Sequence, residues 1–245
     1  MKLEQKFSQQ GADFKVDKLY GDLRGRYGSF NARANGYRLQ VYFRREQELI
    51  LDALGDAQGR VLDIACGSGL MALPLASPSR QVIGVDFNTL ACNAAQENGL
   101  SVFRGDAFCL PLKNSSIDRA LSCQFLNQQS AINARGFVAE AFRVLKPSGQ
   151  LIIVWRNGQA LIHKVAHQIF SVTDLIQGQV TFPNVDHSLD QLTAYATETG
   201  FTVLDQFVSF PLLRWRSREI GSLTARLIGA SNVMVLQKPN PKHGD

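Results

Sequence analysis

A carboxylate and two glycines at fixed spacing are the residues of this chain best suited to bind a nucleoside. Residues 61–69 read Val-Leu-Asp-Ile-Ala-Cys-Gly-Ser-Gly, a pattern typical of a buried strand that ends in a glycine turn. A second apolar run, residues 82–85, ends in Asp86, nineteen residues after Gly67. Glycine lets backbone approach a ligand without a Cβ, and a carboxylate at a strand end can hold ribose hydroxyls. We therefore expect a nucleoside-bearing ligand at this turn.

Two kinds of nucleoside ligand compete for the turn. Residues 67–72 satisfy G-x-G-x-x-A, the pattern of dinucleotide-binding proteins, which is a weak signal alone. Asp63 lies inside the strand, four residues before Gly67, where its charge would repel a pyrophosphate. A carboxylate at that place favours a ligand that carries an ammonium group and a sulfonium.

Strand-like and helix-like segments alternate along the middle of the chain. The expected strands are residues 61–65, 81–85, 100–103, 119–122, 150–155, 201–208 and 231–237. Helices are expected at residues 69–76, 89–97, 131–145 and 189–199, the last ending at Gly200. This order predicts an α/β fold, a doubly wound, mostly parallel seven-stranded sheet with helices on both faces and an antiparallel last strand.

Five segments resemble, in order, the motifs of the class I S-adenosylmethionine-dependent methyltransferases. The resemblance is closest to the type 11 branch, which acts on small molecules, lipids and quinones. The five segments are residues 61–69, 82–87, 104–107, 116–122 and 140–151. Residues 199–201 and 233–238 resemble the last helix and edge strand of the same Rossmann-like fold. The resemblance implies S-adenosyl-L-methionine as cofactor, S-adenosyl-L-homocysteine as product, and in-line transfer of the methyl group.

The resemblance also implies which residues hold each part of the cofactor. The glycine turn would flank the methionine part, and the later strand ends would hold the ribose and the adenine. The expected cofactor-binding residues are Asp63, Ala65, Gly67, Ser68, Gly69, Asp86, Phe87, Asp106, Ala107, Cys123, Gln124 and Tyr27. Asp86 would bind the ribose, Phe87 would pack on adenine, and Asp106 would accept from the adenine amino group. Two simpler roles stay open, a helix N-cap for Asp86 and a core position for Phe87.

Residues for the methyl acceptor are harder to identify. His163 and His167 are four residues apart and share one face of an expected helix, so either could be a general base. His187 follows in a loop, and a surface or hydrogen-bonded structural role is the alternative for all three. Tyr27 or Tyr20 would close over the sulfonium as part of an N-terminal lid, or would only pack that arm on the core. We expect no metal site.

The chain is expected to form a single methyltransferase domain over residues 1–245. Its parts would be an arm or lid (1–58), a cofactor-binding core (59–155), an acceptor-pocket insertion (156–200) and a closing hairpin (201–238). Four scattered cysteines and the lack of a secretory signal or of a long apolar run predict a cytoplasmic protein. The sequence does not predict the oligomeric state.

Charge gives weak information about partners. The net charge is +5, and the basic residues gather in the first 45 residues and near residues 211–230. This asymmetry permits an anionic partner but equally fits a solvated surface. Residues 212–218 could contact a membrane surface or RNA, or could form an ordinary hairpin. We expect a small, lipophilic or anionic organic acceptor; the alternatives are a tRNA or rRNA methyltransferase and a non-catalytic cofactor-binding protein.

Overall fold

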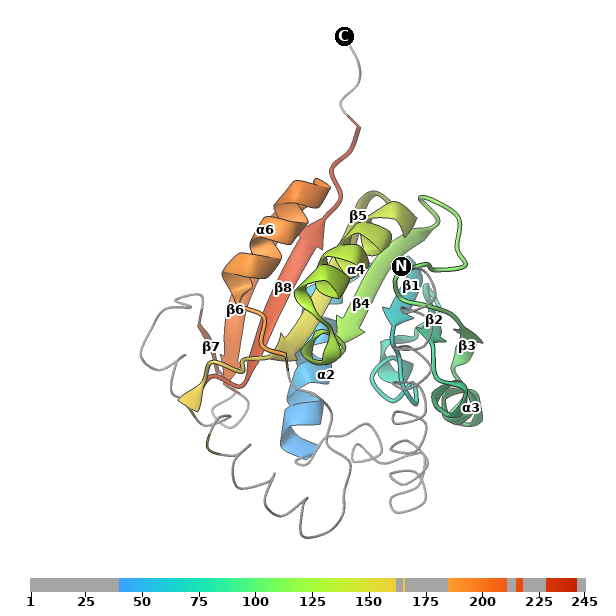
Figure 1. Cartoon of the computed structure of the whole chain (residues 1–245). Coiled ribbons are helices and arrows are strands. Elements are labelled where there is room, and N and C mark those ends of the chain that lie inside the picture. The colour runs from blue at the N-terminus through green and yellow to red at the C-terminus, as the bar shows by residue number, and fades with distance from the viewer. Residues whose placement is uncertain (1–39, 162–164, 166–184, 211–214, 218–227, 242–245) are drawn as a thin grey trace, which may run out of the picture.

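The computed structural model describes residues 40–161, 165, 185–210, 215–217 and 228–241 (Figure 1). One sheet has the order β3-β2-β1-β4-β5-β8-β6-β7. Its strands are β1 (Gly59–Ile64), β2 (Arg80–Asp86), β3 (Ser101–Arg104), β4 (Ile117–Cys123), β5 (Leu145–Arg156), β6 (Thr202–Phe210), β7 (Trp215–Ser217) and β8 (Ser231–Gln237). The helices are α2 (Gln40–Leu54), α3 (Thr89–Glu97), α4 (Ala131–Val144) and α6 (Leu189–Thr199), with 3₁₀ turns η2 (Leu73–Leu75) and η3 (Leu126–Gln128).

The pairing of the strands confirms the predicted doubly wound sheet. The first five strands are parallel, and β8 runs antiparallel to both β5 and β6. All seven predicted strands are present, and the three-residue β7 adds an eighth at the edge. The strand order reverses between β1 and β4, so the carboxyl ends of these strands border the crevice where such folds bind ligands.

Helices cover both faces of the sheet, as the sequence predicts. Leu151, Ile153 and Trp155 of β5 pack with α4 and α6, whereas Ile152 and Val154 pack in a second core with α2. Figure 1 shows α4 and α6 on the near side of the sheet and α2 behind it. Successive strand residues point to opposite faces, so a strand buried on both faces must be apolar throughout. This explains the continuous apolar runs in the sequence.

The ends of α6 follow the expected capping rules. The Ser188 hydroxyl accepts from the Gln191 N–H, and the Gln191 side chain accepts from the Ser188 N–H. Gly200 ends the helix with a φ of 104°, a conformation that glycine adopts without strain. In the described ranges, no helix combines the length and the apolar character needed to cross a bilayer.

The predicted helix at residues 69–76 is wrong. This segment forms consecutive turns that end in the short η2, because Pro74 has no N–H to donate to the carbonyl of Leu70. That carbonyl instead accepts from Nε2 of Gln47 in α2, at 2.8 Å. The glycine turn is therefore held against α2 and does not open a helix.

A glycine in β2 gives a stability test of this packing. A Cβ at Gly84 would lie 2.7 Å from Sγ of Cys66 and 2.8 Å from Cδ2 of Leu100, so Gly84→Ala should destabilise the fold by about 1–3 kcal/mol. The control is Gly136→Ala in α4, where the nearest atom would be 3.9 Å away. That change should stabilise by about 0.5–1 kcal/mol. Urea unfolding midpoints measure both, and an unchanged midpoint for Gly84→Ala would contradict the packing.

Candidate functional site

The glycine turn after β1 has an unusual backbone. Ala65, Gly67 and Gly69 have φ values of 61°, 55° and 76°, in the left-handed region. For Ala65 this costs roughly 1–3 kcal/mol, a strain that often marks a functional site. A Cβ at Gly69 would lie 2.9 Å from Cδ2 of Leu100, so glycine is required there for space as well as for conformation. The turn therefore brings bare backbone to the carboxyl end of β1.

Asp86 ties this turn to the end of β2. Its Oδ2 accepts from the Gly67 N–H at 2.8 Å, and its Oδ1 accepts from the Asn88 N–H at 2.9 Å. Burial raises the pKa of Asp86, although the hydrogen bonds from Asn88, Gly67 and Phe87 act in the opposite direction. The N-cap of α3 is Asn88, which accepts from the Ala91 N–H at 2.9 Å, so the N-cap role considered for Asp86 is wrong.

Asp63 is the second carboxylate of the site. Its side chain is only 1% exposed, and its Oδ2 has no hydrogen-bond partner among the described residues. Burial raises the pKa of Asp63 well above its ordinary value, and the nearby charge of Asp86 raises it further. The pKa of the Cys66 thiol is also well raised, first by burial and then by Asp63 and Asp86. Two buried carboxylates beside one glycine turn would repel a pyrophosphate and attract a cation.

The expected adenine side lies at the ends of β2 and β3. Phe87 is 42% exposed, so a core role for this ring is wrong. The Arg104 guanidinium lies 5.3 Å from the Phe87 ring centroid, and its Nε donates to the Phe87 carbonyl at 2.9 Å. Oδ1 of Asp106 accepts from the Phe108 N–H at 2.9 Å, and Ala107 is buried. The structure thus brings an exposed ring and a carboxylate to the same edge as Asp86.

Comparisons with known proteins agree with this geometry. Residues 62–153 match the family model described as a methyltransferase domain. The chain is 33% identical over 113 residues to the demethylmenaquinone methyltransferase of Renibacterium salmoninarum, covering 45% of this chain and 47% of that protein. It is 34% identical over 147 residues to the enzyme of the same name from Deinococcus radiodurans, covering 57% and 59%. The chain thus spans about half the length of these curated relatives.

A solved structure shares the fold over most of the chain. It is a Thermotoga maritima protein described as an S-adenosylmethionine-dependent methyltransferase, possibly acting on histamine, with a TM-score of 0.64 and 21% identity. The match covers 89% of this chain and 99% of that one. Residues 62–153 therefore carry a methyltransferase domain of the class I S-adenosylmethionine-dependent type.

The chain has a buried glutamate that the sequence pattern did not reveal. Glu46 of α2 is 1% exposed and lies against the carboxyl ends of β4 and the start of β8. Its Oε1 accepts from Nε2 of Gln124 at 2.6 Å and from the Ser231 hydroxyl at 2.5 Å, and its Oε2 accepts from the Cys123 thiol at 3.3 Å. Glu46 shares the buried face of α2 with Phe43 and Ile50, and this helical spacing was the available signal.

Gln124 and its neighbours form a polar ridge, which we define as Glu46, Gln124, Asn127 and Arg156. Gln124 follows β4 with a φ of 62°. Its Oε1 accepts from Nδ2 of Asn127, and Oδ1 of Asn127 accepts from the Arg156 N–H at 3.1 Å. The ridge therefore runs from α2 across the ends of β4 and β5. Cys123 and Gln124 were expected to face the methionine part; the Cys123 thiol and Nε2 of Gln124 instead donate to Glu46.

Of the histidines and tyrosines considered for catalysis, the structure describes only His187. His187 is buried, with its Nε2–H 2.8 Å from the carbonyl oxygen of Gln129, and its own carbonyl accepts from the Trp155 indole at 2.8 Å. It therefore has the structural role. His163, His167, Tyr20 and Tyr27 lie outside the described residues. Within the described ranges, no three His, Cys, Asp or Glu side chains come together as metal ligands would.

The raised pKa of Asp63 makes a prediction about stability without ligand. In the native protein the carboxyl group of Asp63 keeps a proton that it loses near pH 4 in the unfolded chain. The free energy of unfolding therefore falls as the pH rises from about 4 through the native pKa of Asp63. Asp63→Asn should therefore stabilise the ligand-free protein at pH 7, because the amide carries no charge to desolvate. The gain should shrink toward pH 4, as measured by thermal unfolding across this range.

Asp118 is the matched control with the opposite sign. Burial alone would raise its pKa, but hydrogen bonds from Lys146 Nζ at 2.7 Å and the Arg60 N–H at 2.9 Å bring the net shift below the ordinary value. Ionised Asp118 therefore stabilises the fold at pH values above the pKa that it has in the unfolded chain. This stabilisation is lost as the pH falls through its pKa in the native protein. Asp118→Asn should destabilise the protein at pH 7 by roughly 1 kcal/mol. Destabilisation by both substitutions would contradict our description of Asp63.

Proposed function

We propose that this chain transfers a methyl group from S-adenosylmethionine to a small organic acceptor. The observation that carries the proposal is the buried pair Asp63 and Asp86 beside the glycine turn. The free Oδ2 of Asp63 is a buried acceptor that the ammonium group of the cofactor would satisfy. Asp86, held by two backbone N–H groups, is fixed in place to accept from ribose hydroxyls.

The remaining residues of the proposed cofactor site would bind the methionine part and the adenine. Gly67, Ser68 and Gly69 give backbone access to the methionine part, with Ala65 beside them, and Phe87 presents an exposed ring to adenine. Asp106 and the backbone of Ala107 would bind the adenine amino edge. Bound S-adenosylmethionine supplies an already activated methyl group. The chain's own task is then to orient the acceptor and to exclude water.

The comparisons support a small acceptor. Two relatives are named for methylation of demethylmenaquinone, a small molecule, although this chain spans only about half of each. The described residues include no metal-ligand cluster, and the chemistry proposed here requires none. We propose that Tyr27 closes over the sulfonium of the cofactor and that His163 or His167 is the general base; their positions in the sequence support this.

A labelled-cofactor experiment tests the proposed function. The full chain is incubated with cell extract and methyl-labelled S-adenosylmethionine, and small molecules are separated from RNA and protein. We expect the label in a small organic molecule, together with S-adenosylhomocysteine. Label mainly in RNA would contradict the proposed acceptor class. Cofactor binding without transfer to any fraction would indicate a non-catalytic binding protein and would contradict the activity.

Two variants control the experiment. Asp86→Ala removes the acceptor for the ribose and for the Gly67 N–H, so transfer should fall by at least about a hundredfold, corresponding to loss of two hydrogen bonds to a charged group. Asp52→Ala removes an exposed carboxylate on α2 and should leave transfer unchanged. Circular dichroism of both variants checks that a loss of transfer is not a loss of the fold.

A further inference from the structure

The side chain of Arg156 lacks a partner at the ligand-binding edge of the sheet. Arg156 is the last residue of β5, and its Nε is buried without a hydrogen-bond partner. No carboxylate of the described residues forms an ion pair with it. Burial lowers the pKa of Arg156, and Asp186 offsets this only in part. A half-buried cation without a paired anion destabilises the fold, and a bound anionic ligand would remove this penalty.

Two other arginines show what is particular about Arg156. Arg119 and Arg45 also have a buried Nε without a partner. However, Nη1 of Arg119 donates to the Asp118 carbonyl at 2.9 Å, and Nη1 of Arg45 is paired with Glu48 at 2.9 Å. Among the described residues, the Arg156 guanidinium has neither kind of partner. Its state is therefore not a general property of arginines in this fold.

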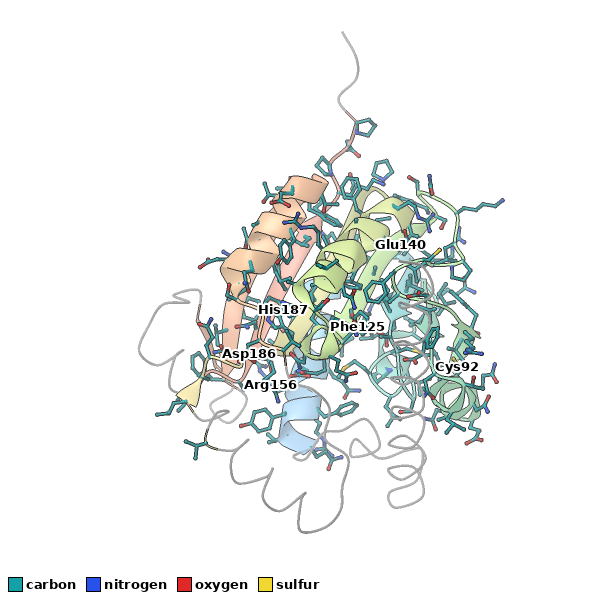
Figure 2. The ribbon with its side chains drawn as sticks, in the orientation of Figure 1. Cys92, Phe125, Glu140, Arg156, Asp186 and His187 are labelled. Carbon is teal, nitrogen blue, oxygen red and sulfur yellow. The ribbon has the colours of Figure 1, made fainter. Side chains whose placement is uncertain are left out.

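The position of Arg156 places it beside the proposed cofactor site. Cys123 of β4 pairs with Val154 of β5, so Gln124 and Arg156 leave the sheet at neighbouring points. Strands lie about 4.8 Å apart, so Arg156 is two strands, or roughly 10 Å, from the line of β1 and its glycine turn. A small molecule can span that distance. Figure 2 shows Arg156, Asp186 and His187 near one another at the carboxyl end of β5.

Asn127 and Gln124 of the polar ridge fix the backbone of Arg156. Asn127 accepts from the Arg156 N–H through Oδ1 and donates through Nδ2 to Gln124, so both ends of its amide are used. The carboxylate of Asp186 lies against Gly158, two residues after Arg156; a Cβ at Gly158 would be 1.6 Å from Oδ1 of Asp186. The backbone is thus held in place, while the guanidinium keeps its donors for another group.

We propose that Arg156 binds a carboxylate or phosphate group of the methyl acceptor, which makes the acceptor a small oxyanion. This inference rests on the proposed function, because it places an acceptor beside the cofactor. The planar guanidinium presents paired N–H donors that match two oxygens of such a group. Arg156 therefore selects the acceptor by its charge and turns its reacting end toward the glycine turn.

The test observes the Nε–H of Arg156 directly by ¹⁵N NMR of the full chain. Acetate and inorganic phosphate are added separately, with chloride at matched ionic strength as the reference. Arg156→Lys identifies the signal by its disappearance, and the Nε–H of Arg119, at the other end of the sheet, is the internal control. We expect a saturable shift of the Arg156 signal only. The anion that saturates at lower concentration identifies the group as carboxylate or phosphate.

Two outcomes would overturn the proposal. One is an Arg156 signal that does not respond beyond the chloride reference, and the other is an equal response of Arg119, which would show an adventitious ion only. Neither outcome depends on methyl transfer, so failure here is distinct from failure of the proposed function. With the acceptor that the labelled-cofactor experiment identifies, Arg156→Gln should raise the acceptor KM by about tenfold or more while cofactor affinity is kept. Arg119→Gln should change neither.

Discussion

The hydrogen bond from the Gly67 N–H to the buried carboxylate of Asp86 holds the site together. It joins the turn after β1 to the end of β2, while the other oxygen of Asp86 holds the chain at Asn88, the cap of α3. The turn can approach Asp86 only because Gly67 and Gly69 adopt left-handed conformations and because Gly84 leaves room for Cys66. Removing this carboxylate would release the turn and the start of α3 together.

The same carboxylate explains the electrostatics of the crevice. Asp86 lies close enough to Asp63 to raise its pKa, and both groups are almost fully buried. Such a pair is unfavourable in the empty protein and becomes favourable when a cation is bound. The polar ridge, which includes Arg156, lies across the neighbouring strand ends. The crevice therefore has two buried carboxyl groups on the cofactor side and the guanidinium of Arg156 at the end of β5. A cationic donor and an anionic acceptor would meet between them.

The sequence predicted the features that depend on local pattern. The strand around Asp63, the carboxylate at Asp86 and the helix end at Gly200 follow from apolar runs and from glycine conformations, which single segments reveal. The helix at residues 69–76 was wrong because the pattern gave too little weight to Pro74. Glu46 was missed because its partners, Gln124 and Ser231, are 78 and 185 residues away, and only the folded sheet brings them together. The division into lid, core, insertion and hairpin stays a prediction.

Calorimetric titration of S-adenosylmethionine between about pH 5 and 8 tests the central claim most directly. A bound cation should lower the pKa of Asp63, so affinity should rise with pH and binding should release protons, which is seen when buffers of different ionisation enthalpy give different heats. Asp63→Asn should bind more weakly and lose most of this proton release. Equal affinity and equal proton release in the wild type and in Asp63→Asn would contradict the account.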